Sequence, residues 1–220
     1  RHMQVAYSKQ LLGVPSGRRP SKAEMELTAA HEAGHAVVNE AMRKALGVNL
    51  EGNSSFRTVA HISIVPAGGT GGVTQFAEPE ESVRMPESRR VLLAELAVCM
   101  GGRAAEELEN GLGEATMGAR GDFDQATRLA TDMVTVGGLS DTVGPRALNT
   151  GGPLSQETRR KVDVEVDKLL RKALQAARAA LKKNKPLWEA VSKALLEHET
   201  LDGESFRKLV EKHHVQPAWV

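Results

Sequence analysis

This chain of 220 residues has few of the features that mark several large classes of protein. Aromatic side chains make up only 3% of it, which argues against nucleic-acid binding by base stacking and favours a core of Leu, Val, Ala and Met. Its formal net charge is +1, so no strong field attracts nucleic acid or a membrane surface. The single cysteine, Cys99, excludes an intrachain disulfide and fits a reducing compartment, either the cytoplasm or the interior of an organelle.

Long apolar runs and phosphate-binding loops are also missing. No window approaches the roughly 18 consecutive apolar residues of a membrane-spanning helix, so we expect a soluble chain. The pattern G-x-x-x-x-G-K-[ST] does not occur, and the glycine-rich run 68–72 precedes a predicted strand, which lacks the helix dipole that phosphate sites use. Proline and glycine within residues 1–20 predict an irregular lead-in, part of which we expect to be a tag.

Apolar periodicity predicts a mainly α-helical chain with a small β-sheet, which is an α+β class. Ser21 and Glu24 have the spacing of a capping box and predict a helix that reaches about Leu46. β-branched residues predict strands over 56–65 and 73–76, the second at a sheet edge. Further helices are expected over 86–110, from about 122 to 136, over 155–184, and near 187–198 and 203–213.

The most informative pattern is His31-Glu32-Ala33-Gly34-His35, an H-E-x-x-H sequence within the first predicted helix. Residues four apart lie on one face of a helix, so the imidazoles of His31 and His35 can hold one metal ion together. Glu32 is placed to remove a proton from water bound to that metal. Zinc is the metal expected, because it lowers the pKa of its bound water toward ~7.

The third ligand is not fixed by this pattern, although a catalytic zinc usually has three protein ligands. The extended pattern H-E-x-x-H-x-x-G-x-x-H fails, because Ala41 stands where it needs a histidine. Spacing leaves two candidates, a glutamate of the segment 101–107 such as Glu106, or Asp122. Either carboxylate suits zinc, so both remain open at this point.

Several segments resemble, in the same order, segments of the FtsH family of membrane-associated zinc proteases. Residues 31–38 resemble its active-site helix, and 100–108 its G-G-R-x-A-E-E segment. Residues 116–127 resemble its T-x-G-A-x-x-D-[LI]-x-x-A-T segment, and 130–135 and 138–145 its A-R-x-M-V and G-M-S-D-x-L-G-P segments. The resemblance covers roughly residues 24–210 and predicts one FtsH-type peptidase domain over 21–215.

This resemblance implies a role for each candidate site residue. Asp122 is then the third zinc ligand beside His31 and His35, and Glu32 is the general acid and base. In the family, the acids of the G-G-R segment are structural and do not bind the metal.

The residues expected to support the site are Arg103, Glu106 and Glu107. We expect Arg103 to pair with one of the two glutamates, as a group behind the metal ligands would.

The implied activity is that of a zinc-dependent endopeptidase acting on unfolded proteins or peptides. Val73, Thr74 and Gln75, on the predicted edge strand, would align an extended substrate by backbone hydrogen bonds. The family assembles as homo-hexamers and is membrane-anchored, with an AAA ATPase domain before the peptidase domain. Neither an anchor nor an ATPase domain is recognised in this sequence, so we expect either a piece cut from a longer protein or a stand-alone peptidase. In the second case a separate AAA ATPase would be the partner needed for folded substrates.

The sequence differs from the family segments at two further places, and three rival hypotheses about its function remain open. Gly121 stands where the family has asparagine, and the segment 47–56 is rich in Gly, Asn and Ser. The rivals are a catalytically silent ring subunit or scaffold, a metal hydrolase with Glu106 as ligand, and a binding module that uses the basic face of helix 155–184. Zinc content tests the first, Asp122→Ala the second, and binding to a heparin column the third.

Overall fold

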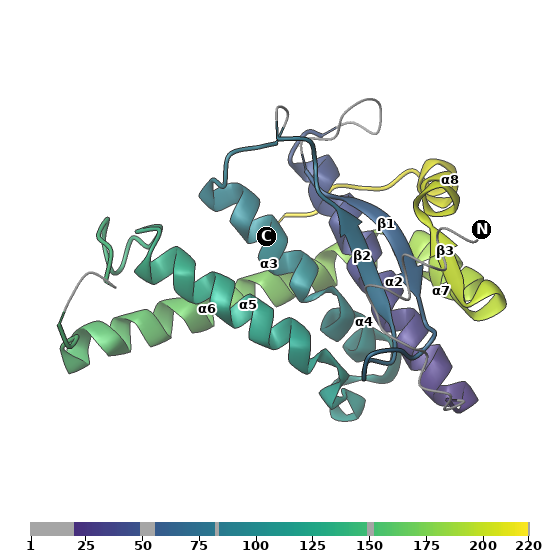
Figure 1. The fold of residues 1–220 in the computed structure, drawn as a ribbon, viewed down its shortest axis with the longest axis horizontal. Coiled ribbons are helices and arrows are strands. Elements are labelled where there is room, and N and C mark those ends of the chain that lie inside the picture. Colours follow the sequence, from purple (N-terminus) through teal and green to yellow (C-terminus); the bar gives the residue numbers. More distant parts are fainter. Residues whose placement is uncertain (1–19, 49–55, 82–83, 149–151, 220) are drawn as a thin grey trace.

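The computed structural model describes residues 20–48, 56–81, 84–148 and 152–219. Most of the predicted lead-in over 1–20 and of the segment 47–56 lies outside these residues. The helices are α2 (Lys22–Ala45), α3 (Arg89–Cys99), α4 (Gly101–Asn110), α5 (Arg120–Thr135), α6 (Gln156–Lys183), α7 (Lys185–His198) and α8 (Gly203–His213). Together with one small antiparallel sheet they confirm the predicted α+β class (Figure 1).

Helix α2 lies at the centre of the fold. It begins with the predicted capping box, in which the Glu24 amide donates to the Ser21 hydroxyl at 3.2 Å and the Ser21 amide donates to the Glu24 carboxylate at 2.8 Å. After the helix, Gly47 has a φ of 81°, which favours glycine. Nearly every residue from Ala29 to Arg43 is buried, because α2 contacts the sheet and helices α3, α4, α6 and α7.

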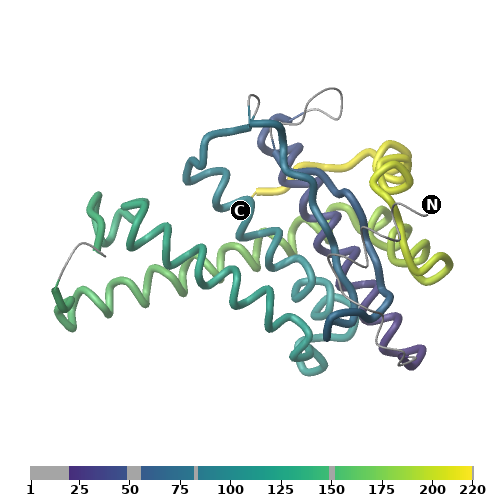
Figure 2. The backbone as a smooth tube through the Cα atoms, viewed as in Figure 1, coloured from purple at the N-terminus to yellow at the C-terminus, as the bar shows by residue number. Residues whose placement is uncertain are grey.

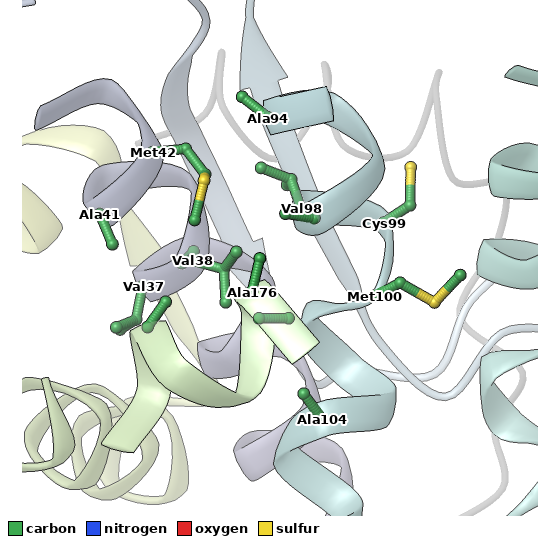
Figure 3. Packing of buried hydrophobic residues seen from close by; sticks show 14 of the residues in the cluster. Val37, Val38, Ala41, Met42, Ala94, Val98, Cys99, Met100, Ala104 and Ala176 are labelled. Atoms are coloured by element: carbon green, nitrogen blue, oxygen red, sulfur yellow. The ribbon is translucent and has the colours of Figure 1, made fainter. Parts of the chain in front are cut away.

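The core around α2 is built from small and branched aliphatic side chains. Val37, Val38, Ala41 and Met42 of α2 belong to one buried cluster with residues of α3 and α4 and with Ala176 of α6 (Figure 3). This agrees with the expectation of a core poor in aromatic residues. Because α2 is held on several sides, the side chains that it carries are firmly positioned.

Among the described residues the sheet has three strands in the order β2-β1-β3, all antiparallel. They are β1 (Thr58–Ser63), β2 (Val73–Ala77) and β3 (Thr200–Asp202). Ile62 of β1 lies opposite Thr74 of β2 and Leu201 of β3. The edge position predicted for the second strand is confirmed, and β3 was not predicted, because its three residues are too few to show a period.

The prediction of one continuous helix over 86–110 is wrong. The chain instead forms α3, capped by the hydroxyl of Ser88, and α4, with the break at Met100. The break lets the backbone of α4 approach α2 closely. A Cβ on Gly101 would lie 2.7 Å from the Cα of His35, and a Cβ on Gly34 would lie 2.6 Å from the carbonyl oxygen of Gly101. Only glycines permit this contact.

The path from α4 to α5 is irregular. It passes through two short 3-10 turns, η1 (Leu112–Glu114) and η2 (Met117–Ala119), and α5 then runs alongside α6 (Figure 2). Within the described ranges, no helix is long and apolar enough to cross a membrane. Cys99 is buried, and burial raises the pKa of its thiol to about 11.

Candidate active site and metal centre

The histidines of the H-E-x-x-H pattern meet a carboxylate from a distant helix. His31 and His35 stand one turn apart on α2, with their Nε2 atoms 3.1 Å from each other. Oδ2 of Asp122, near the start of α5, lies 3.2 Å from Nε2 of His31 and 3.3 Å from Nε2 of His35. The fold therefore brings Asp122 to the atoms of both histidines that would face a shared ion.

The opposite nitrogen of each imidazole is held by an acceptor. Nδ1 of His31 lies 2.8 Å from Oε1 of Glu106, and Nδ1 of His35 lies 2.8 Å from the carbonyl oxygen of Val98. Both acceptors favour the tautomer with the proton on Nδ1. Each Nε2 then offers a lone pair, which is the usual arrangement behind metal-binding histidines.

The donor set fits a zinc ion in both chemistry and spacing. Two imidazole nitrogens and one carboxylate oxygen are typical of catalytic zinc sites. Tetrahedral ligands at roughly 2.0–2.1 Å from zinc are about 3.3 Å apart, and the three donor atoms are separated by 3.1, 3.2 and 3.3 Å. The three residues border a cleft of about 620 Å³, which leaves room for water and substrate.

Glu32 lines the same cleft and is 6% exposed. The Thr74 hydroxyl lies 2.7 Å from Oε2 of Glu32, to which it donates, and 3.0 Å from the Glu32 carbonyl oxygen. Burial raises the pKa of the Glu32 carboxyl, while the nearby histidines and Thr74 act in the opposite direction. A buried carboxyl with a raised pKa is suited to accept and return a proton.

The charges of the cluster depend on one another. Burial lowers the pKa of His31, but hydrogen bonds to Asp122 and Glu106 outweigh it and raise that pKa to about 10. Burial acts to raise the pKa of Asp122, yet hydrogen bonds from His31 and His35 hold it well below its usual range. A metal cation would take over the role of the His31 proton, so its binding must release protons.

Gly102 of α4 makes room for the imidazole of His31, a role that the sequence did not reveal. A Cβ on Gly102 would lie 2.2 Å from Nε2 of His31. On the other wall, a Cβ on Gly72 would lie 2.9 Å from Cγ of Glu32. The Gly-Gly pair at the start of α4 was a visible signal, although only the fold shows what it contacts.

The adjacent acids of α4 face different neighbours. Glu106 accepts from His31 and also from the amide and hydroxyl of Thr116, at 2.7 and 3.1 Å. Glu107 instead pairs with Arg103 of α4, at 2.8 Å, and with Arg178 of α6. Glu106 thus contacts a histidine of the cluster, whereas Glu107 joins two helices.

The edge strand β2 forms one wall of the cleft. Val73 and Thr74 are among the lining residues, together with Phe76. Gln75 is not among them, and its side chain points to the opposite face of the strand from those of Thr74 and Phe76. The structure therefore brings Thr74 to Glu32, whereas Gln75 does not line the cleft.

Comparison with known proteins agrees with this geometry. Residues 18–209 match Peptidase family M41. Over 195 residues, 88% of this chain and 23% of the relative, the chain is 39% identical to ATP-dependent zinc metalloprotease FTSH 9, chloroplastic/mitochondrial, of Oryza sativa subsp. japonica. It is 33% identical to ATP-dependent zinc metalloprotease FtsH of Chloroflexus aggregans, with coverages of 95% and 32%.

A third relative is ATP-dependent zinc metalloprotease YME1L of Drosophila melanogaster, at 33% identity over 96% of this chain and 28% of the relative. The chain spans between 23% and 32% of the length of these three proteins. The likeness to FtsH proteins that the motifs implied is thus confirmed across nearly the whole chain. The chain belongs to Peptidase family M41.

Proposed function

We propose that this chain is a zinc-dependent endopeptidase that hydrolyses peptide bonds of unfolded proteins or peptides. His31, His35 and Asp122 would hold the zinc. The observation that carries the proposal is the convergence of their three donor atoms within 3.3 Å of one another, beside Glu32 in an open cleft. The printed names of the relatives, all zinc metalloproteases, support it.

Zinc at this site would lower the pKa of a coordinated water toward ~7 and polarise a peptide carbonyl. Glu32 would take the proton from the attacking water and deliver it to the nitrogen of the leaving amine. Thr74, which donates to Glu32 at 2.7 Å, would hold that carboxylate toward the water. Glu106 and the carbonyl of Val98 would keep the imidazoles oriented with Nε2 toward the metal.

The edge strand would select an extended substrate. β2 has a partner only on its β1 side among the described strands, and it borders the cleft next to Glu32. A substrate chain that adds to this edge must be unfolded locally, and it would be bound mainly through its backbone. We expect Gln75→Pro, which removes one amide donor, to lower kcat/KM for a peptide, and Gln75→Ala to leave it near the wild-type value. Equal values for both variants, at equal melting temperatures, would refute this alignment.

The partners we propose follow from the relatives rather than from this chain. Those relatives are named ATP-dependent, so a folded substrate would need an AAA ATPase to deliver it in extended form. A homo-hexameric ring is the assembly we propose for that purpose. Without an ATPase, the chain should cleave unfolded casein and spare a stable folded protein, which a comparison of the two substrates measures.

The decisive experiment for the function combines zinc content with cleavage of an unfolded protein, for the wild type and for Glu32→Gln. We expect about one zinc per chain in both and cleavage only by the wild type, because an amide cannot take the proton. Equal cleavage by Glu32→Gln would remove Glu32 from the mechanism. No zinc in either protein would favour the silent subunit, whereas zinc in both with cleavage in neither would mean that an intact site needs its ATPase or its ring. Retention of zinc by Asp122→Ala but not by Glu106→Ala would favour Glu106 as the ligand.

A further inference from the structure

Arg57 differs in its surroundings from the other arginine of the cleft. The lining residues include Arg57, just before β1, and Arg120, at the exposed start of α5. The guanidinium carbon of Arg57 lies 4.7 Å from the ring centre of Phe76 and 5.8 Å from that of Phe56. Aromatic rings stack on the faces of a guanidinium and leave its in-plane N–H donors available.

Among the described residues these donors have weak partners: Arg57 forms a hydrogen bond with the Cys99 thiol, which is a weak acceptor, and it interacts with the charge of Glu95 only at longer range. Across the described ranges Arg57 forms no ion pair within 4.0 Å, and its Nε is buried without a hydrogen-bond partner. Glu95 borders a neighbouring depression with Arg57 but does not come within ion-pair distance. A guanidinium at the wall of a cleft, with a thiol as its hydrogen-bond partner and no carboxylate within ion-pair distance among the described residues, can still pair with a carboxylate from outside.

The acids of the cleft do not supply that partner, because each is already engaged. Glu106 and Asp122 contact the histidines, and Glu32 accepts from Thr74. The backbone of Arg57 is itself fixed, because the side-chain amide of Asn39, a fully buried residue of α2, donates to its carbonyl oxygen at 3.1 Å. The position of the guanidinium is therefore set before any substrate arrives.

The distance along β2 tells which part of a substrate would reach Arg57. Thr74 and Phe76 are two residues apart and face the same side of the strand. Their separation along the strand is roughly 6.7 Å. Thr74 contacts Glu32, and Phe76 contacts Arg57. A side chain that meets Arg57 thus belongs to a residue about two or three positions from the bond that is cleaved.

We propose that Arg57 is a specificity residue that binds an acidic side chain of the substrate near the scissile bond. The inference rests on the proposed peptidase function and deepens it. A carboxylate can accept two parallel hydrogen bonds from a guanidinium, whose geometry it matches. The pairing would add a side-chain preference to recognition that otherwise depends on the substrate backbone.

The test uses pairs of fluorescence-quenched peptides that differ only by Glu or Gln at one position, scanned across the positions around the cleaved bond. The wild type should cleave the Glu peptide about tenfold better at one position. Arg57→Met keeps an unbranched apolar stem and should abolish the preference, and Arg57→Lys should keep part of it. Arg120→Met, which removes the exposed cleft cation, should leave the ratio unchanged.

A binding measurement separates this inference from the proposed function. The zinc-loaded Glu32→Gln protein should bind the labelled Glu peptide about tenfold more tightly than the Gln peptide by fluorescence anisotropy, whether or not the wild type has activity. Adding Arg57→Met to it should make the two affinities equal. Three results would overturn the role of Arg57. They are equal cleavage of the Glu and Gln peptides by the wild type, a preference for the Glu peptide that survives Arg57→Met, and no binding of either peptide. Loss of turnover alone, with the binding preference intact, would count only against the peptidase function.

Discussion

The two halves of the candidate metal centre are built differently. The side chains of His31 and His35 are 12% and 9% exposed, on a helix that the core surrounds, and each has an acceptor at Nδ1. The Asp122 side chain is 26% exposed and stands in the first turn of α5 at the cleft rim. The histidine half is therefore fixed by packing, whereas the aspartate half can adjust to the ion.

The contrast is visible in the glycines on each side. A Cβ on Gly102 would lie 2.2 Å from Nε2 of His31, which is too close unless the ring moves. A Cβ on Gly121, next to Asp122, would meet nothing within 4 Å. Gly121, which stands where the resembled FtsH segment has asparagine, thus has open space around it. Substitutions should accordingly be severe on α4 and mild at the start of α5.

The largest effect is expected from Gly102→Ala. Its Cβ would lie 2.2 Å from Nε2 of His31, so the ring must move away from the other donors. We expect zinc affinity to fall more than ~100-fold and the metal-free protein to lose about 1–3 kcal/mol of stability. Competition with a chelator and thermal unfolding measure the two effects.

Gly121→Ala is the matched control for that variant. It should keep wild-type zinc affinity and gain up to about 1 kcal/mol, because alanine favours a helix more than glycine does. If both variants lost zinc equally, the distinction between the rigid and the adjustable half would be wrong.

An intermediate effect is expected from the adjacent acids of α4. Glu106→Ala leaves Nδ1 of His31 without its acceptor and should weaken zinc binding by about 10- to 100-fold. Glu107→Ala should leave zinc affinity unchanged and lower stability through its lost pairs with Arg103 and Arg178. Zinc titration and thermal unfolding of both variants separate the roles, and equal zinc affinities would show that Glu106 does not support the site.

The smallest effect is expected at the wall formed by β2. Thr74→Val removes the hydroxyl that donates to Glu32 and should lower kcat by about tenfold, with zinc content unchanged. Thr74→Ser restores a donor and should recover most of the rate. A Thr74→Val protein as active as the wild type would mean that Glu32 needs no orientation from the strand.

The sequence predicted what depends on local pattern. The capping box of α2, the edge strand and the face shared by His31 and His35 could all be read from spacing, and the α+β class followed from periodicity. The break at Met100 could not, because apolar periodicity continues across it and the cause is close contact with another helix. The short strand β3 likewise exists only through pairing with β1.

The choice between Asp122 and Glu106 illustrates the same limit within the site. Both carboxylates suit zinc, and nothing in their spacing shows which nitrogen of His31 each would meet. Only the crossing of α4 over α2 places Glu106 at Nδ1, while the turn into α5 places Asp122 at Nε2. The orientation of Thr74 toward Glu32 depends on the sheet register in the same way.

We propose that His31, His35 and Asp122 together hold one zinc ion. The most direct test of this site is an anomalous difference map at the zinc absorption edge from a crystal of the zinc-loaded protein. We expect a single peak about 2.0–2.2 Å from Nε2 of both histidines and from a carboxylate oxygen of Asp122, with Glu106 still at Nδ1 of His31. A peak coordinated by Glu106 in place of Asp122, or no peak at this cluster, would contradict it.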